Sequence, residues 1–345
     1  MKTDVLLLST LHRSHARRSG YQLLADYLPG AEFLHTVRAE PVSPLPLFAA
    51  RVARRLAFSR WYLGGCAALE WKTRRRLQAG FDGVVHSMWA DHDLGFLDFL
   101  LDRKRHRLCG TFHNCLDTFR HTIRFPRRLR KFDAIILMSE TQRPFFLQAG
   151  VKAEKIHVVL HGVDTEYFAP REAAKTLDGK FTVLSVGGYR RNFPLLREVC
   201  QRMQHDENIR FEIVAPKGWS DMFAGLPNTQ FFAGLDDTDL LEKYQTASCF
   251  LHTAENATAN NTLLEAMSCS LPVIAENIGG IPEYVDADSA TLTPAGDATA
   301  LENSIHALAA SPAKQGSMRL AARSRAVELD WKNVAARMTA IYRSL

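Results

Sequence analysis

The 345-residue sequence lacks any unbroken run of about 18 apolar residues, the length that a membrane-spanning helix needs. It holds only six cysteines, with no Cys-x-x-Cys pair and no regular spacing. This pattern argues against a disulfide scaffold or a zinc site and favours reduced thiols in a cytoplasmic protein. Internal repeats, low-complexity tracts and the Walker A, Gly-x-Ser-x-Gly and His-Glu-x-x-His motifs are also missing from the sequence.

Charge is divided unevenly along the chain, although the formal net charge is only +6. Residues 1–165 carry 26 basic against 15 acidic side chains, whereas residues 166–345 carry 17 against 22. We therefore expect the first half to face something anionic, such as nucleic acid, a membrane surface or a phosphorylated substrate. Because no helix-turn-helix, RNP or zinc signature is present, we expect no nucleic-acid partner.

The stretch from Pro44 to Gln78 mixes aromatic and basic residues, and a second basic cluster covers 120–131. Amphipathic helices of this composition suit a membrane interface, where rings lie at headgroup depth and cations meet anionic lipid. The alternative is a pair of ordinary surface helices whose arginine stems cover a sheet. The stretch contains Phe48, Phe58, Trp61, Tyr62 and Trp71 among Arg51, Arg54, Arg55, Arg60, Lys72, Arg74, Arg75 and Arg76.

Short aliphatic runs alternate with longer amphipathic stretches, which is the pattern of βαβ units and a mostly parallel sheet. We expect an α/β fold of two Rossmann-like domains with a central cleft, joined by a linker over Asp164–Lys180. In such sheets ligands bind beyond the carboxyl ends of the strands. The predicted strands are Val5–Ser9, Gly83–His86, Leu108–Phe112, Ala134–Met138, Ile156–Leu160, Thr182–Val186, Arg210–Val214, Thr229–Ala233, Cys249–His252, Pro272–Ala275 and Ala290–Thr293.

The strongest chemical signal lies between Thr258 and Glu283. Polar residues open a predicted helix at Asn261, a buried strand follows, and the chain then reaches the loop Gly279-Gly280-Ile281-Pro282-Glu283. Free N–H groups at a helix start favour a phosphate, and two glycines let the backbone approach a ligand closely. Glu265 falls about one turn into this helix, where its carboxylate can accept hydrogen bonds from ribose hydroxyls. In isolation, Glu265 is better interpreted as a solvated helical glutamate.

Three segments together resemble a known family. They are Leu263-Leu264-Glu265-Ala266-Met267-x-Cys269-x-Leu271-Pro272-Val273-Ile274, the Gly279–Glu283 loop, and His161-Gly162-Val163-Asp164 with Phe168-x-Pro170. They look like retaining GT-B glycosyltransferases of family 4. The resemblance implies an N-terminal acceptor domain over 1–165, rejoined by a C-terminal helix over 330–345, and a nucleotide-sugar donor domain over 175–329. It also implies that no divalent metal is obligatory and that no cofactor is needed beyond the donor.

Several donor-site residues follow from this resemblance. Gly187, Gly188, Arg190 and Arg191 stand where the family places a glycine strand end and the basic residues that neutralise the donor pyrophosphate. Lys217 is a weaker candidate for the same role. Glu265 matches the ribose-binding glutamate of the family's Glu-(seven residues)-Glu pattern, but the position eight residues earlier is Ala257. The candidate substitutes for the missing carboxylate are Glu255, two residues early, and Asn260 or Asn261 at the helix start; Thr262 and Leu263 are further predicted donor-binding residues.

In the first domain, Ser19 and Gly20 follow the first strand, and the resemblance places their backbone beside the donor phosphates. His113 ends a buried strand and resembles the family histidine that lies beside the reacting sugar carbon, with His86 as a second example. A lone histidine at a strand end is otherwise more often structural. The run Asp91-His92-Asp93 resembles a metal-binding cluster, but we expect no metal there.

The sequence thus predicts a retaining, metal-independent transfer of sugar from a UDP- or GDP-sugar to a glycan, glycolipid or other hydroxyl acceptor. Ala257 and the imperfect Ser19-Gly20 match keep one alternative open, a catalytically silent GT-B protein that binds a nucleotide sugar or a partner enzyme. A sugar-nucleotide epimerase on the same fold is a third option. The expected partners are a nucleotide sugar and a glycan or lipid-linked acceptor. The expected location is the cytoplasm, with peripheral attachment to the anionic inner face of the membrane as a further expectation.

Overall fold

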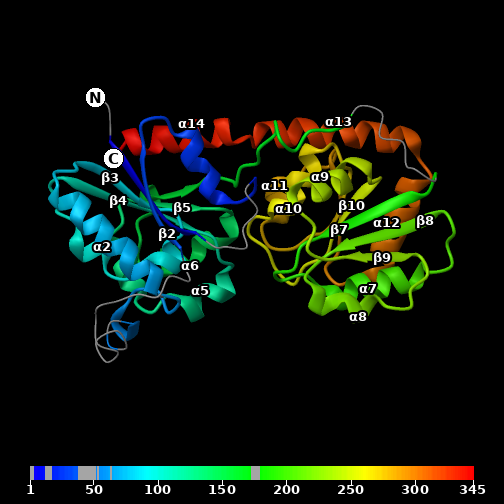
Figure 1. The fold of residues 1–345 in the computed structure, drawn as a ribbon, viewed down its shortest axis with the longest axis horizontal. Helices are drawn as coiled ribbons and strands as arrows, with labels where there is room; N and C mark the ends of the chain where they lie inside the picture. Colours follow the sequence, from blue (N-terminus) through cyan, green and yellow to red (C-terminus); the bar gives the residue numbers. More distant parts are fainter. Residues whose placement is uncertain (1–3, 12–17, 38–51, 53, 63, 172–178) are drawn as a thin grey trace. The chain divides into compact units, whose positions relative to one another are not determined.

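The computed structural model describes residues 4–11, 18–37, 52, 54–62, 64–171 and 179–345. The chain divides into two compact units, one made of Met1–His161 with Trp331–Leu345 and the other of Gly162–Asp330. Figure 1 shows that each unit is a sheet covered by helices. Each unit is treated below by itself. The structure confirms the predicted α/β class with two Rossmann-like domains.

In its described residues the first unit has one parallel sheet of six strands, in the order β2-β1-β3-β4-β5-β6. The strands are β1 (Val5–Leu11), β2 (Glu32–Val37), β3 (Gly83–Ser87), β4 (His106–Phe112), β5 (Ala134–Leu137) and β6 (Ile156–Val158). The helices and 3-10 turns are η1 (Tyr21–Tyr27), α2 (Gly64–Gln78), α3 (Ala90–Asp93), α4 (Leu97–Leu100), α5 (Leu116–Thr122), η2 (Pro126–Lys131), η3 (Glu140–Gln142), α6 (Arg143–Gln148), η4 (Ala153–Lys155) and α14 (Trp331–Arg343).

The described part of the second unit also forms a parallel six-stranded sheet, ordered β12-β11-β10-β7-β8-β9. Its strands are β7 (Phe181–Val186), β8 (Ile209–Val214), β9 (Thr229–Phe232), β10 (Cys249–His252), β11 (Val273–Glu276) and β12 (Ala290–Thr293). Its helical elements are α7 (Phe193–Arg202), η5 (Lys217–Trp219), α8 (Ser220–Phe223), α9 (Asp237–Thr246), α10 (Asn261–Ser268), α11 (Ile281–Tyr284), α12 (Ala298–Ala309) and α13 (Pro312–Glu328).

Aliphatic strands form the core of each sheet, as expected for parallel strands covered on both faces. Leu6, Val85 and Ile135 are fully buried in the first unit, and each such side chain contributes about 1.5–3 kcal/mol relative to exposure. Every predicted strand is present, with ends within two residues of expectation. No strand was predicted at β2, most of whose residues are only partly buried because the strand lies at the sheet edge.

Helix α14 completes the first unit although it lies at the other end of the sequence (Figure 1). The hydroxyl of Tyr342 lies 2.6 Å from Nδ1 of His86, and Nε2 of His86 lies 2.8 Å from Oγ1 of Thr111. Tyr21 contacts both Thr111, through a 3.1 Å hydrogen bond, and the ring of Trp331. Complete burial lowers the pKa of His86 to about 3, so its ring is neutral and both nitrogens are used. His86 therefore anchors α14.

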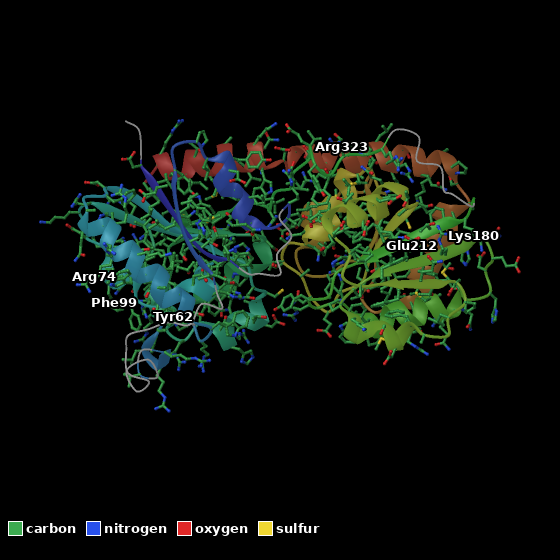
Figure 2. The ribbon with its side chains drawn as sticks, in the orientation of Figure 1. Tyr62, Arg74, Phe99, Lys180, Glu212 and Arg323 are labelled. Carbon is green, nitrogen blue, oxygen red and sulfur yellow. The ribbon has the colours of Figure 1, made fainter. Side chains whose placement is uncertain are left out.

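Arg323 of α13 fastens two other segments of the second unit to its own helix (Figure 2). Its guanidinium donates to the carbonyl oxygens of Ser268 at 2.7 Å, Phe168 at 3.1 Å and Thr165 at 3.0 Å. Two of these carbonyls belong to the stretch that we expected to be an interdomain linker, Asp164–Lys180. Its first residues are instead part of the second unit, and 172–178 lie outside the described residues.

The aromatic residues between Pro44 and Gln78 do not share one environment. Phe58 is fully buried, and Tyr62 is buried with its hydroxyl donating to Oε2 of Glu70 at 2.8 Å. The other oxygen of Glu70 accepts three backbone N–H groups from residues 95–97. Phe58 and Tyr62 are therefore core residues, which corrects their proposed place at a membrane interface. Trp71 is 58% exposed, while Phe48 and Arg51 lie outside the described residues.

All six cysteines are buried, and none forms a disulfide. In the part of the chain that the structure describes, no helix is both long and apolar enough to cross a bilayer.

We expect Tyr342→Phe to destabilise the first unit by about 1–3 kcal/mol, because it leaves Nδ1 of a buried histidine without its hydrogen-bond partner. The measurement is the urea midpoint of the full chain followed by circular dichroism. Tyr189→Phe, at a tyrosine that is 74% exposed, is the control and should shift the midpoint little. Equal midpoints for Tyr342→Phe and the native chain would contradict this role for α14.

Candidate functional site

The carboxyl edge of the second sheet has a topological switch point between β7 and β10. From β7 the chain continues to β8 and β9 on one side, whereas β10 to β12 lie on the other. Ligands of open α/β sheets bind at such points. The loop after β7 contains Gly187, Gly188, Arg190 and Arg191, and α10 begins beside it. The structure thus brings most of the predicted donor residues to one sheet edge.

Arg191 forms hydrogen bonds with three elements at this edge of the sheet. Its Nε and Nη2 donate to the carbonyl oxygen of Val186 at 3.0 and 2.8 Å, and its Nη1 lies 2.8 Å from Nε2 of His252. Nη2 also donates to Oδ1 of Asn260 at 3.1 Å and to Oγ1 of Thr262 at 2.7 Å. The residue is only 7% exposed, so its guanidinium is devoted to fixing β7, β10 and the start of α10.

Burial sets the electrostatics around this guanidinium. Desolvation lowers the pKa of Arg191 to about 10, while Tyr244 and Glu265 act in the opposite direction. The pKa of His252 falls well below its usual value, because the ring is buried and faces Arg191. A neutral His252 that accepts from Arg191 on Nε2 carries its proton on Nδ1. That atom has no hydrogen-bond partner among the described residues.

The start of α10 is formed by a conventional N-cap. Oδ1 of Asn260 accepts the backbone N–H of Leu263 at 3.0 Å and the hydroxyl of Thr262 at 2.7 Å. With the bond from Arg191, this one oxygen serves three donors, so Asn260 can offer a ligand only its amide N–H groups. Asn261, the first residue of the helix, is half-buried.

Glu265 lies one turn further along α10 and is 3% exposed. Its Oε2 accepts the hydroxyl of Tyr244 at 2.8 Å, and burial beside this carboxylate raises the pKa of that phenol well above its usual range. The interpretation of Glu265 as a solvated surface residue is therefore wrong. A buried carboxylate oriented by a tyrosine at a sheet edge is suited to accept hydroxyl donors from a ligand.

The missing glutamate position is part of a tightly held loop. Ala257 is buried, and its carbonyl accepts the N–H of Gly280 at 2.9 Å. Gly279 has φ +54°, and a Cβ there would lie 2.1 Å from the Ala257 carbonyl oxygen, so only glycine fits. Glu255 is exposed, and its backbone N–H donates to the Arg190 carbonyl at 3.0 Å. The structure places Glu255 beside the arginine loop but does not bury its side chain.

Two residues that the sequence did not suggest, Glu276 and His252, support the loop at Ala254 and the Arg191 guanidinium. Glu276, at the end of β11, accepts the N–H of Ala254 at 2.8 Å and that of Gly296 at 2.7 Å. His252 holds Arg191, as described above. Neither lies in a recognisable motif, and only their positions at strand ends in the same sheet could have indicated them.

The glycines after β7 are packed on both sides. Gly187 has φ +117°, and a Cβ there would lie 2.8 Å from Nη2 of Arg191, while a Cβ on Gly188 would lie 2.7 Å from Pro216. Lys217 follows Pro216 as an exposed residue at the start of η5. Arg190 is half-buried with φ 53°. Arg190 and Lys217 are thus the cations on these loops whose side chains reach solvent.

In the first unit, the corresponding switch point lies between β1 and β3. His113 follows β4, is half-buried, and has its Nε2 2.8 Å from the Met88 carbonyl oxygen. Its ring stacks on Trp89 with centroids 3.8 Å apart. Ser19 and Gly20 precede η1, where Gly20 has φ 102° and the Ser19 carbonyl accepts from Gln22. Residues 12–17, which connect them to β1, lie outside the described part.

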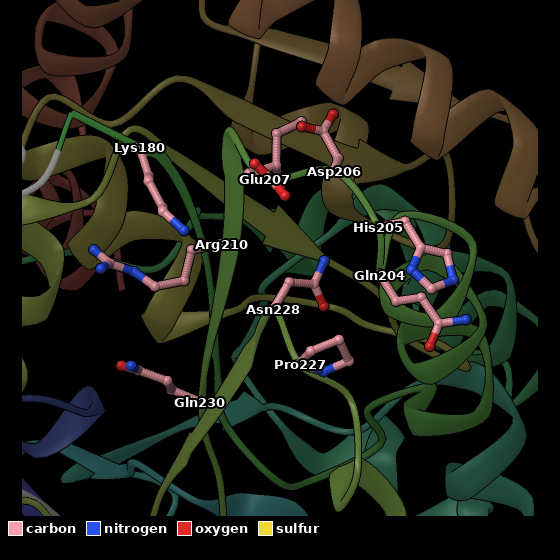
Figure 3. Close-up of a pocket in the computed structure, with 10 residues that line it drawn as sticks. Lys180, Gln204, His205, Asp206, Glu207, Arg210, Pro227, Asn228 and Gln230 are labelled. Atoms are coloured by element: carbon pink, nitrogen blue, oxygen red, sulfur yellow. The ribbon is translucent and has the colours of Figure 1, made fainter.

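A hollow of about 380 Å³ opens elsewhere on the second unit, at the amino-terminal ends of β8 and β9 (Figure 3). Its lining includes Lys180 and Arg210 together with Asp206 and Glu207. The hollow lies at the opposite edge of the sheet from the arginine loop, so it is separate from the predicted donor residues. Among the described residues, no three His, Cys, Asp or Glu side chains gather as a metal site requires.

Comparison with known proteins gives consistent matches. The family model described as Glycosyltransferase Family 4 matches residues 21–167, and the one described as Glycosyl transferases group 1 matches residues 180–311. Sulfoquinovosyl transferase SQD2 of Arabidopsis thaliana is 27% identical over 172 residues, 46% of this chain and 33% of that protein. D-inositol 3-phosphate glycosyltransferase 1 of Catenulispora acidiphila is 26% identical over 227 residues, 56% and 53% of the respective chains.

The chain therefore spans between a third and about half of the length of these two curated relatives. Among solved structures, Anabaena Alr3699/HepE in complex with UDP and glucose superposes with a TM-score of 0.73 at 15% identity and covers all of both chains. At that identity the likeness concerns the fold.

The two adjacent arginines should respond differently to substitution. We expect Arg191→Ala to destabilise the second unit by about 2–4 kcal/mol, because it removes the donor for a buried carbonyl and for His252. Arg190→Ala should cost at most about 1 kcal/mol, since that residue is half-buried and alanine and arginine tolerate its φ equally. Urea midpoints of both variants measure the difference. Equal destabilisation by the two would contradict the structural role of Arg191.

Proposed function

Because the chain belongs to the GT-B glycosyltransferases of the family 4 type, we propose that it transfers a sugar from a nucleotide-diphosphate sugar to a hydroxyl acceptor. The observation that carries the proposal is the arrangement at the β7–β10 switch point. A buried guanidinium orders the loop after β7, Arg190 reaches solvent from that loop, and buried Glu265 lies one turn into the neighbouring helix. Pyrophosphate and ribose need these two kinds of partner, a cation and a carboxylate.

The chemistry follows from the leaving group. As the bond between the anomeric carbon and the donor phosphate breaks, negative charge grows on the nucleoside diphosphate, and a fixed guanidinium stabilises it. In our proposal Arg190 supplies this cation, with Lys217 as a second, while Arg191 holds the loop in place. The free N–H groups at the start of α10 favour the same charge. These groups replace a divalent metal, so we propose metal-independent transfer.

We further propose that transfer proceeds with retention of configuration. The acceptor hydroxyl attacks the anomeric carbon from the face that the phosphate leaves, and its proton passes to an oxygen of the departing phosphate. The family resemblance supports this route. We propose UDP as the nucleotide, since a solved structure of the same fold is described in complex with UDP and glucose; GDP is the alternative.

Ala257 supports a second candidate function. The loop that carries it is held by a backbone hydrogen bond from Gly280 to Ala257 and offers no carboxylate at the position where the family glutamate meets the donor sugar. A protein that binds the nucleotide sugar without turning it over is consistent with that loss. An epimerase on the same fold is the third alternative, and it would form product without any acceptor.

For the acceptor, we propose a phosphorylated or lipid-linked molecule at an anionic membrane surface. The exposed arginines of the first unit that have no acidic partner among the described residues include Arg54, Arg55, Arg74 and Arg75. Arg75 lies 4.9 Å from the exposed ring of Trp71 on α2, and Figure 2 shows Arg74 on the same helix. A relative named D-inositol 3-phosphate glycosyltransferase is consistent with a phosphorylated acceptor.

The donor reaction is tested by incubating the purified chain with UDP- and GDP-sugars, with and without acceptor extract, and measuring nucleoside diphosphate release. We expect release with UDP-sugar and acceptor, unchanged by EDTA, and a loss of about 100-fold in kcat for Arg190→Ala. Arg202→Ala, at an exposed arginine paired with Glu198 on α7, is the control and should keep full activity. Nucleotide binding without release from any donor would favour the silent alternative, and product without acceptor the epimerase.

Membrane association is tested by co-sedimentation with vesicles of neutral lipid and of neutral plus anionic lipid. We expect the chain to pellet with anionic vesicles at low salt and to be released at high salt. The double variant Arg74→Gln/Arg75→Gln should bind about 30-fold more weakly, at about 1 kcal/mol for each cation. Arg202→Gln is the control from the second unit. Equal pelleting with both vesicle types would remove the anionic surface, and the role given to the arginines, from the proposal.

A further inference from the structure

Asp91 of α3 is a buried carboxylate that the proposed reaction leaves without a role. It is fully buried, and its Oδ2 accepts three hydrogen bonds from the loop after β4. The donors are the backbone N–H of His113 at 2.9 Å, the backbone N–H of Asn114 at 2.8 Å and the side-chain amide of Asn114 at 2.7 Å. One carboxylate oxygen therefore fastens the main chain of His113 to α3.

The second carboxylate oxygen of Asp91, Oδ1, is not accounted for by the packing and hydrogen bonds of the loop. Oδ1 is buried and has no hydrogen-bond partner within the described ranges. Burial raises the pKa of Asp91 to about 6, while the three N–H donors favour the ionised form. An unsatisfied buried oxygen is a cost that native proteins seldom retain without a use, so each such atom calls for an explanation.

The same short segment also holds the ring of His113. Nε2 lies 2.8 Å from the Met88 carbonyl oxygen, which can only accept, so the proton is on Nε2. The ring stacks on Trp89 at 3.8 Å and 22°, and Tyr21 meets it edge-on at 4.8 Å. Residues 88–91 thus contact the backbone N–H of His113, its Nε2 atom and one face of its ring. Burial in this environment lowers the pKa of His113 well below its usual value, so the ring is neutral.

We propose that Asp91 is a positioning residue that, by holding the N–H groups of His113 and Asn114, fixes the His113 imidazole as the neutral tautomer with its proton on Nε2. The inference deepens the proposed function and rests on it, because it matters for transfer only if His113 lies beside the reacting sugar. Without Asp91 the loop after β4 is released, and the contact between the ring and Met88 is lost with it.

The first test reads the tautomer directly and needs no activity. Long-range ¹H–¹⁵N NMR of the full chain gives the ring nitrogen shifts, and His113→Gln identifies the signals of His113. We expect the native chain to show the Nε2–H pattern alone. Asp91→Ala should show averaged shifts from a mixture of tautomers. Asp91→Asn keeps an oxygen acceptor but loses its charge, so its shifts should lie between these two.

Asp98→Ala is the matched control. Asp98 is another buried aspartate of the first unit, with a side chain that is 1% exposed, but it pairs with Arg128 and Lys131 instead of the His113 loop. Its loss should weaken the unit and leave the His113 tautomer unchanged. If Asp91→Ala does not fold, Asp91→Asn carries the test. A native tautomer pattern in every folded Asp91 variant would overturn the proposal, as would the same mixture in Asp98→Ala.

The second test is a double-mutant cycle on turnover. Asp91→Asn should lower kcat about 10-fold, with the KM for the donor sugar and the affinity for UDP unchanged, and should change kcat less than twofold in the His113→Gln background. Multiplicative losses would overturn the proposal. If the native chain turns over no donor, the proposed function fails, whereas the NMR test still decides whether Asp91 sets the tautomer.

Discussion

The candidate donor site depends on the burial of one charged group, the guanidinium of Arg191. A cation with 7% exposure needs a partner for each N–H, and the partners come from the end of β7, the end of β10 and the start of α10. Satisfying this one side chain therefore places three elements of the second unit relative to one another. Asn260 connects Arg191 to the helix start, because the side-chain oxygen that caps α10 also accepts a hydrogen bond from Arg191. The positions of the loops that face a ligand therefore follow from the hydrogen bonds of Arg191.

Buried carboxylates hold other loops of the fold in place by accepting hydrogen bonds from their N–H groups. Glu276 accepts N–H groups from two loops of the second unit, and in the first unit Glu70 and Asp91 each accept three. For Glu276 and Asp91 the physical reason is that chain leaving a parallel strand has N–H groups that no neighbouring strand can pair. The donors to Glu70 stand at the start of α4, where the first N–H groups of a helix lack intrahelical partners. Where the strand end instead presents a carbonyl, as at Val186, a hydrogen-bond donor is needed, and the Arg191 guanidinium supplies it.

The sequence contains enough to predict most of the fold and part of the site. Aliphatic runs located every strand except β2, which is partly exposed at a sheet edge and has no such run. The motif around Glu265 located α10, because an N-cap and an apolar face are local properties. Local pattern could not show that Glu265 and Arg191 are buried, nor that His252 and Glu276 support them. Those facts arise from strands far apart in sequence meeting at one edge.

The charge surplus of the first half also becomes more specific once side-chain pairing is considered. Arg76, Arg103 and Arg128 are paired with acids of the same unit, so much of their charge is neutralised locally. The arginines of α2 at 74 and 75 have no such partner among the described residues, and Trp71 on the same helix is exposed. A field that attracts an anionic surface comes from charges that are not already balanced. The acceptor side of the proposed enzyme is therefore better represented by the outer face of α2 than by the first half as a whole.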